Sequence, residues 1–502
     1  MLSPLLLAAF GQAGIAGALS SNRFGVPGVN RTFDYVGYNG RTMHYSQGRT
    51  LGGTSAINTL GYHRPSAGSL QMWADAVGDQ SWAWDKVLPF YQKCCTLSGP
   101  DLERLGPDGA AAIPDESRAF APAGSGGGGP LNVSYGGYRG EYAAAVAAGL
   151  DRLGLKRLPG LNTGELLGHA PITVTVDPRT MTRVSSAAFL HAVDADARLT
   201  IYHSTLAEKV VFDGDKRAGG VEVKVTGQRD YRFTLSASRE VVVSGGVFKS
   251  PQLLMLSGVG PADVLTKFDI PKVSVLEGVG QNLWVNVTTM TQLERPEYFN
   301  AVSEEYLSTR TGPLTSIKAG ETIGWEKIPE PYRSRLSAST RAHLSTFAPD
   351  FPETELLPFN AGAHPAIDNN NDDGDDHLSS NNWITLAVGI LTPKSRGNVT
   401  LTTTTTAAAP PAVNPNWLSA PEDEEQAVQA VLRAREWAAS LPDGVVVAEY
   451  APGPGVASDR PDDVARWLRE AGALVFHGSS TCAMGKPDDP MAVLDSAARV
   501  YG

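Results

Sequence analysis

The pattern of hydrophobic and polar positions predicts a chain in which short strands and helices follow one another. Runs rich in β-branched and aromatic residues, typical of strands, lie at 199–202, 209–212, 220–225 and 240–244. Runs typical of helices lie at 142–153, 250–256 and 422–440, and Pro421 stands just before the last of these. Because the two kinds of element interleave, the predicted fold class is α/β plus α+β.

Composition narrows the class of protein. The chain has 502 residues, of which 42% are hydrophobic and 19% are charged, so it is long enough for two or three domains with buried cores. Its 53 glycines and 34 prolines favour many short elements joined by turns over a helical bundle. The net charge of −11 comes without a basic patch, which argues against a nucleic-acid partner. No apolar run has the length of a membrane span, so no membrane partner is expected.

Three further features bear on compartment and metal binding. The apolar start, residues 1–10, has no positively charged leader, so we interpret it as part of the fold and not as a signal peptide. Cys94, Cys95 and Cys482 are too few for a zinc or disulfide framework. Free thiols are predicted, with one bridge to Cys482 as the alternative. The acidic stretch 366–377 fits no calcium-binding loop and is interpreted as a solvated connection. No metal site is predicted, and the compartment stays open.

A glycine-rich segment at 48–58 carries the first candidate chemistry. Its sequence is GRTLGGTSAIN, with glycines at 48, 52 and 53. Glycines let backbone N–H groups approach a ligand closely, and a run of such donors suits a pyrophosphate. Arg49 adds a charged donor, while Thr54, Ser55 and Asn58 add polar contacts. The alternative is an ordinary tight turn before a helix, and the local sequence does not decide between the two.

A strand–turn–helix pattern follows at 240–260. The predicted strand at 240–244 is followed by a turn at Gly245 and Gly246. Ser250 is predicted as the helix N-cap, Pro251 as the first helical residue and Gly258 as the end of the helix. Nucleotide-binding sheets use this order at the carboxyl edge of their strands. A purely structural crossover is the alternative, because the segment has no G-x-G-x-x-G fingerprint.

The third candidate segment is 476–485, with the sequence FHGSSTCAMG. Small polar residues follow His477, which indicates a tight and polar pocket. An imidazole with a pKa near 6.5 can accept a hydroxyl proton at neutral pH. A lone histidine is also often structural, and that interpretation stays open at this point.

Together the three segments resemble the glucose–methanol–choline (GMC) oxidoreductase family. Residues 48–58 match the family pattern G-R-x-L-G-G-[ST]-S-x-I-N, and residues 250–260 match S-P-Q-L-L-x-x-S-G-[VI]-G. Shorter matches occur at 62–64, 278–282, 391–399 and around His477. The likeness extends over residues 24–502 and is greatest to fungal members.

The resemblance implies two interleaved domains. An FAD-binding domain, here without the N-terminal Rossmann strand, is expected at 1–90, 190–290 and 441–502. A substrate-binding domain built on an antiparallel sheet is expected at 91–189 and 291–440.

The resemblance also implies oxidation of a small-molecule alcohol, primary or secondary, by hydride transfer to FAD. His477 is the implied catalytic base. The implied contacts to FAD are Arg49, Leu51, Gly52, Gly53, Thr54, Ser55, Asn58, Val210 and Gly245.

This chain departs from the family pattern in three places. Relatives begin with a strand and a G-x-G-x-x-G turn, whereas the glycines within 11–17 have another spacing and no such strand before them. Relatives carry a second His or Asn, and a closing segment, beyond the position that Gly502 occupies here. Val285 and Asn286 stand where relatives have Asp-His. Three interpretations are therefore kept: alcohol oxidation, a non-redox relative acting as a cyclase or lyase, and an inactive fragment.

Overall fold

The computed structural model describes residues 31–36, 42–105, 113–121, 128–193, 199–227, 231–295, 309–312, 315–316, 321–359 and 382–502. The predictions for the apolar start at 1–10, the glycines within 11–17 and the acidic stretch 366–377 lie outside these residues. Helices and antiparallel sheets are mixed along the described chain, which confirms the predicted fold class.

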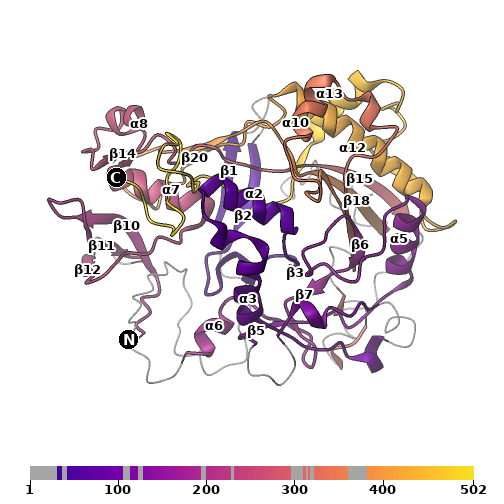
Figure 1. Cartoon of the computed structure of the whole chain (residues 1–502), viewed down its shortest axis with the longest axis horizontal. Helices are drawn as coiled ribbons and strands as arrows, with labels where there is room; N and C mark the ends of the chain where they lie inside the picture. The colour runs from indigo at the N-terminus through magenta and orange to yellow at the C-terminus, as the bar shows by residue number, and fades with distance from the viewer. Residues whose placement is uncertain are drawn as a thin grey trace.

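The largest element is a seven-stranded antiparallel sheet, which occupies one half of the molecule in Figure 1. Six strands follow the order β21-β15-β18-β17-β16-β6, and β22 pairs with β15 beside β21. The strands are β6 (Gly168–Pro171), β15 (Val287–Arg295), β16 (Thr322–Glu326), β17 (Thr354–Phe359), β18 (Asn382–Ile390), β21 (Ala448–Ala451) and β22 (Ala473–Leu474). Segments far apart in the sequence therefore share one sheet, and the division into two domains stays a prediction.

The pleat of this sheet gives it two different faces, because successive side chains point to opposite sides. On the outer face, Leu386 and Val388 pack with Ala434 and Trp437 of helix α12. On the opposite, inner face, Trp325 and neighbouring apolar residues of the strands pack toward the segment that precedes His477. The helices around this sheet are α5 (Glu141–Arg152), α10 (Ala338–Leu344), α12 (Pro421–Ser440) and α13 (Pro461–Ala471).

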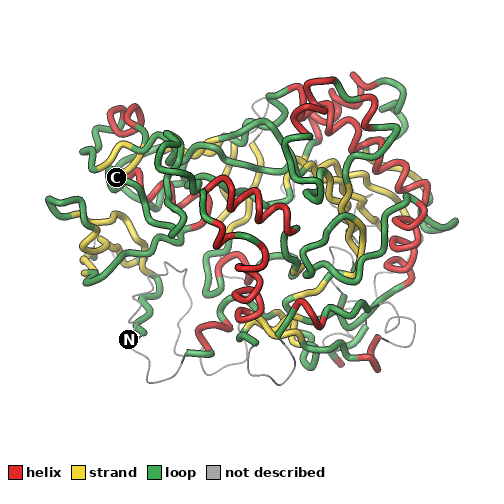
Figure 2. Tube along the Cα trace, viewed as in Figure 1, coloured by secondary structure: helices red, strands yellow, loops and turns green. Residues whose placement is uncertain are grey.

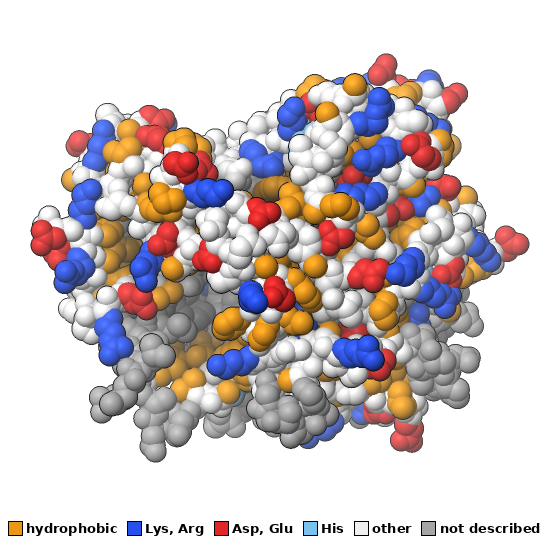
Figure 3. Space-filling view, in the orientation of Figure 1, with side chains coloured by type: hydrophobic (Ala, Val, Ile, Leu, Met, Phe, Trp, Pro, Cys, Tyr) orange, Lys and Arg blue, Asp and Glu red, His pale blue; other side chains and the backbone are white. Residues whose placement is uncertain are grey.

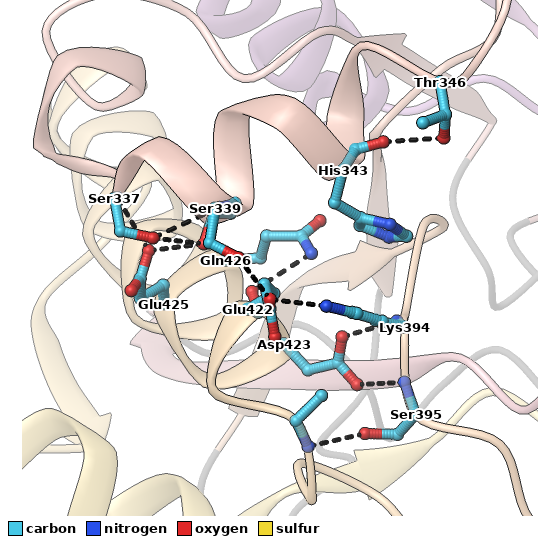
Figure 4. A network of polar contacts seen from close by, with 12 residues as sticks. Ser337, Ser339, His343, Thr346, Lys394, Ser395, Glu422, Asp423, Glu425 and Gln426 are labelled. Carbon is cyan, nitrogen blue, oxygen red and sulfur yellow. Dashed lines mark hydrogen bonds and ion pairs between the residues drawn. The ribbon is translucent and has the colours of Figure 1, made fainter.

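The acidic first turn of α12 fastens the loop that follows β18 (Figure 4). The Asp423 carboxylate accepts hydrogen bonds from the backbone N–H groups of Lys394 and Ser395 at 2.6 and 2.9 Å. The Lys394 ammonium donates to Glu422 at 2.6 Å. Negative charge is favourable at a helix N-terminus, so these carboxylates stabilise α12 and hold the 391–397 loop together.

The other half of the molecule is built from smaller sheets and helices around α7 (Figure 2). A three-stranded antiparallel sheet has the order β10-β11-β12, and β1 pairs with β2. These elements are β1 (Arg31–Val36), β2 (Thr42–Gln47), β10 (Thr205–Phe212), β11 (Ala218–Val225), β12 (Arg232–Ser236), α7 (Gly246–Leu256), β13 (Val259–Gly260), α8 (Ala262–Lys267), β14 (Ser274–Val275), β19 (Asn398–Thr400) and β20 (Ala412–Asn414).

Short elements connect the two halves. Helices α2 and α3 cross the middle of the molecule in Figure 1. The connecting elements are β3 (Gly61–Tyr62), α2 (Ala67–Val77), α3 (Trp84–Cys94), β4 (Cys95–Leu97), β5 (Leu131–Val133), β7 (Thr173–Val174), β8 (Val176–Asp177), β9 (Thr182–Arg183) and α6 (Ala188–His191). The face in Figure 3 mixes acidic and basic side chains without a large region of one charge among the described residues.

Most predicted elements are confirmed, and three details are wrong. The strands predicted at 209–212 and 220–225 lie in β10 and β11, and the predicted helices at 142–153 and 422–440 are α5 and α12. The three cysteines are free thiols, as predicted. Residues 199–202 and 240–244 are not strands, because none of the described strands pairs with them. Strand formation depends on a partner, which local composition does not supply.

The start of α7 is the third difference. The helix begins at Gly246 with Gly245 as its N-cap, so Ser250 and Pro251 lie inside it and not at its start. Its predicted end is confirmed, because Gly258 follows the helix with a left-handed φ of 87°. Pro251 has no N–H to donate to the Val247 carbonyl one turn earlier, and this carbonyl is therefore available to another donor.

Candidate functional site

The glycine-rich segment forms a compact turn that opens on one side. A Cβ on Gly48 would lie 2.2 Å from the Gly53 carbonyl oxygen, and a Cβ on Gly52 would lie 2.5 Å from the Ser185 hydroxyl. Only glycine fits these two positions. Gly53 differs, because it has a φ of 54° and a Cβ there would meet no atom within 4 Å. Its backbone therefore faces open space that a ligand can approach.

The polar side chains of the segment hold the turn itself. Thr54 Oγ1 accepts a hydrogen bond from the Gly48 N–H at 3.2 Å. Ser55 Oγ donates to the Gly52 carbonyl at 2.5 Å and accepts from the Ser186 N–H at 2.9 Å. Asn58 Oδ1 accepts from the Arg183 guanidinium at 2.6 Å. The sequence predicts that Thr54, Ser55 and Asn58 contact FAD. Because their side chains form hydrogen bonds that hold the turn, we propose that they support the loop that meets the cofactor.

Arg49 and Leu51 stand at the open side of the segment. Both side chains are partly exposed. The Arg49 guanidinium forms no ion pair or hydrogen bond with the described residues, so it is available to an anionic ligand. Leu51 offers an apolar contact beside it.

The N-terminus of α7 lies against this turn. Gln47 Nε2 donates to the Gly245 carbonyl at 3.3 Å. Gly246 has a left-handed φ of 78°, which favours glycine, and a Cβ there would lie 2.6 Å from Gln47 Nε2 unless that side chain moved aside. The first N–H groups of a helix have no partner within the helix and favour an anion. Gly245 and the Arg49 segment are thus brought together, as a phosphate-binding site needs.

Val210 lies apart from this turn, on strand β10. Its backbone N–H donates to the Ser257 hydroxyl at 2.8 Å, and its side chain is buried. In an antiparallel strand the N–H and C=O of one residue point to the same side, so the Val210 carbonyl also faces away from β11. A contact between this backbone and an adenine ring stays a prediction.

His477 stands on a loop that several segments hold in place. Ser479 and Trp284 exchange two backbone hydrogen bonds of 3.0 and 3.1 Å. The Gly280 N–H donates to the Thr481 carbonyl at 2.8 Å. Thr481 Oγ1 donates at 2.6 Å to the Val247 carbonyl, the one that Pro251 leaves available. The loop that carries His477 is therefore hydrogen-bonded to α7 through Thr481, four residues after the histidine.

A second histidine, His63, belongs to the same region. Its ring packs on Trp325 with centroids 4.7 Å apart, and Nδ1 lies 3.2 Å from the Arg64 carbonyl. Because a carbonyl only accepts, a neutral ring would hold its proton at Nδ1 and keep Nε2 as an acceptor. The sequence offered His63 only as part of a motif match at 62–64, and the prediction of site residues missed it.

Both histidines are solvent-accessible and yet have protein close around them. Each side chain is exposed, yet desolvation by surrounding protein lowers the pKa of His477 and lowers the pKa of His63 to about 4. The charge of protonated His477 adds to the shift at His63, so the two rings are close enough to interact.

The inner face of the large sheet supports this region. Trp325, Glu355, Gly389 and Thr288 are directly opposite one another on four neighbouring strands, so their side chains share one face. Trp325 hydrogen-bonds to the Glu355 carboxylate. Glu355 is 4% exposed, and burial raises its pKa to about 7. The sheet face on which Trp325 packs against His63 therefore also carries the buried polar residues Glu355 and Thr288. This arrangement could not be predicted from the sequence.

Comparisons with known proteins identify the family. A GMC oxidoreductase N-terminal model matches residues 8–288, and a GMC oxidoreductase C-terminal model matches residues 393–502. The chain belongs to the GMC oxidoreductase family. It is 41% identical over 478 residues to the glucose methanol choline oxidoreductase atC of Aspergillus terreus, an alignment that covers 93% of this chain and 74% of that protein.

Two further similarities place the chain within the family. It is 37% identical over 494 residues to the versicolorin B synthase stcN of Emericella nidulans, covering 94% of this chain and 74% of that protein. Its fold is similar to an FAD-dependent oxidoreductase from Chaetomium thermophilum, with a TM-score of 0.80 and 24% identity over 99% of this chain and 87% of the other. The resemblance to fungal GMC proteins is thus confirmed.

FAD is the cofactor of this GMC protein, and the described residues fit its pyrophosphate. Gly53 presents a backbone without an obstructing side chain, Arg49 supplies a positive charge that no described residue pairs, and the α7 N-terminus supplies N–H donors. Within the described part of the chain, no three His, Cys, Asp or Glu residues are grouped to hold a metal ion. Among the described helices none is both long and apolar enough to cross a bilayer.

Proposed function

We propose that this chain oxidises a primary or secondary alcohol, with FAD as hydride acceptor and His477 as base. One observation carries the proposal. His477 stands on a loop bonded to α7, where surrounding protein lowers its pKa, and the N-terminus of the same helix adjoins the glycine-rich turn. The base and the cofactor loop are therefore fixed to one helix.

The proposed chemistry divides between cofactor and protein. Bound FAD supplies a hydride acceptor, and with it a sink for the two electrons of the oxidation. An unprotonated ring nitrogen of His477 takes the hydroxyl proton, so the alcohol becomes a carbonyl compound. Because desolvation lowers the pKa of His477, this nitrogen is free to accept a proton at neutral pH. His63 stays neutral as well and offers Nε2 as a hydrogen-bond acceptor to the substrate.

A reaction without net oxidation at the same site is the second candidate. The chain is 37% identical to a protein named versicolorin B synthase, so close relatives are not all named for oxidation. Such a reaction would also use His477 to move a proton, but bound FAD would not change its oxidation state.

Anaerobic mixing of the FAD-loaded chain with a panel of alcohols tests the proposal. We expect wild type to bleach the flavin band with at least one alcohol, and His477→Gln to do so about 10²–10⁴ times more slowly. His203→Gln, an exposed histidine outside the site, is the matched control and should behave like wild type. The rate of flavin reduction in wild type should fall on acidification only below pH 6.5, the ordinary pKa of histidine. Turnover without bleaching would instead support the second candidate.

A further inference from the structure

Tyr45 makes two hydrogen bonds that enclose His477. Its hydroxyl donates to the Phe476 carbonyl at 2.5 Å and accepts from the Gly478 N–H at 3.1 Å. Tyr45 lies on β2, more than 400 residues earlier in the chain. One side chain therefore binds the backbone on both sides of the histidine.

These two bonds fix the direction of the His477 side chain. The Phe476 carbonyl belongs to the peptide plane before the His477 Cα, and the Gly478 N–H belongs to the plane after it. Peptide planes are rigid, so only the φ and ψ of His477 remain between them. Because the Tyr45 hydroxyl oxygen is hydrogen-bonded to both planes, it restricts both angles at once. The direction of the Cα–Cβ bond, and with it the orientation of the imidazole, is therefore restricted as well.

Tyr45 itself is held firmly. It is 6% exposed, and its ring packs at right angles to Phe248 on α7, with centroids 4.9 Å apart. Phe476 covers another side of the ring at 5.3 Å. Phe476 has a φ of 59°, a conformation that a bulky residue adopts only when its surroundings impose it. Burial raises the pKa of Tyr45, so its hydroxyl keeps the proton that it donates.

The position of Tyr45 on β2 links the base to the cofactor loop. Residues two apart on a strand share a face, so Tyr45 and Gln47 point to the same side. Gln47 binds the start of α7, and the glycine-rich turn begins at the next residue. The strand thus carries, in order, the contact to the His477 loop, the contact to α7 and the turn that meets FAD.

We infer that Tyr45 is a positioning residue, which sets the imidazole of His477 at a fixed place relative to the flavin loop. The inference rests on the proposed function in so far as His477 is the base. Loss of the hydroxyl should leave the pocket intact but free the His477 backbone. A displacement of about 1 Å in a reacting group can cost about 100-fold in rate.

Tyr45→Phe is the direct test, because it keeps the ring packing and removes only the hydroxyl. We expect the rate of flavin reduction at saturating alcohol to fall about 10- to 100-fold while KM stays nearly unchanged. Water should enter the loosened loop, so the pKa of His477 should rise toward 6.5. Tyr501→Phe is the matched control, since it removes another tyrosine hydroxyl that donates to a backbone carbonyl, that of Gly485 at 3.0 Å. It should leave both the rate and the pKa at wild-type values.

The titration of His477 supplies a readout that needs no turnover. Carbon-13 labelling of histidine lets NMR follow each imidazole in the FAD-loaded protein without alcohol, with His477→Gln assigning the signal. An unchanged His477 titration and an unchanged reduction rate in Tyr45→Phe would overturn the inference. If Tyr45→Phe does not fold, Thr481→Val decides by the same two measurements, because it frees the same loop from α7. If wild type reduces no flavin, the proposed function is contradicted but the inference about Tyr45 is not, because the His477 titration still tests it.

Discussion

Replacing Glu355 with glutamine should remove a pH dependence that this one carboxyl imposes on stability. Glu355 lies on the inner face of the large sheet, and burial raises its pKa from 4.5 to about 7 although a hydrogen bond from Trp325 opposes the shift. In the unfolded chain the carboxyl has its ordinary pKa. A difference of this size between the two states corresponds to about 3 kcal/mol in the free energy of unfolding.

The sign of the effect follows from which state holds the proton. Below pH 4.5 the carboxyl is protonated in both the folded and the unfolded state, so the stability that depends on its being neutral is fully present. As the pH rises toward and through 7, the unfolded state has already lost its proton while the folded state must ionise a buried group, so wild type loses stability. Glutamine stays neutral throughout. We therefore expect the variant to match wild type at low pH and to exceed its stability by up to about 3 kcal/mol above pH 7.

Urea unfolding followed by tryptophan fluorescence, at one pH below 4.5 and one well above 7, measures this difference. Glu470→Gln is the control, because it removes an exposed carboxylate from α13 and should leave the pH dependence as in wild type. If the gap between Glu355→Gln and wild type is the same at both pH values, the carboxyl has the same pKa in the folded and unfolded states, and the placement of Glu355 on the buried face is wrong.

Two other predictions concern the core and the cofactor turn. Arg433→Met should lower the free energy of unfolding by about 3–5 kcal/mol, because Glu326, its partner at 2.7 Å, would stay buried without a counter-charge. The Arg433→Met/Glu326→Leu double variant should recover most of that loss in the same urea assay; a single variant as stable as wild type would refute the reasoning. Gly48→Ala should lower the melting temperature, since its Cβ would lie 2.2 Å from the Gly53 carbonyl oxygen. Gly53→Ala should stay folded but lose more FAD on desalting than wild type, and equal retention would show that this backbone does not meet the cofactor.

Local sequence patterns predicted those parts of the fold that depend on neighbouring residues. The helix α12 follows from a long run of good helix formers after Pro421, and Gly258 ends α7 because only glycine easily adopts its left-handed φ. The glycine-rich turn at 48–58 was likewise visible, since Gly48 is required by a contact within the segment and Gly52 and Gly53 adopt a left-handed φ of 89° and 54°. The family motifs located His477 for the same reason, as they are continuous in the sequence.

Features that depend on distant residues could not be predicted. Residues 240–244 have the composition of a strand, but no described strand lies beside them. Glu355 resembles any acidic residue in a strand until the register places it opposite Trp325 on the inner face. Tyr45 meets Phe476 and Gly478 only because the chain returns to β2 after more than 400 residues. A strand's pairing, its register and such a return are properties of the whole fold, which short patterns do not encode.

The visible spectrum during anaerobic mixing with alcohols tests the central proposal most directly. The chain is loaded with FAD, desalted and mixed with each alcohol of the panel, with His477→Gln measured alongside. We predict that the flavin band persists after desalting, bleaches with an alcohol in wild type and bleaches far more slowly in the variant. A flavin that stays oxidised with every alcohol, or that bleaches equally fast without His477, would contradict alcohol oxidation with His477 as base.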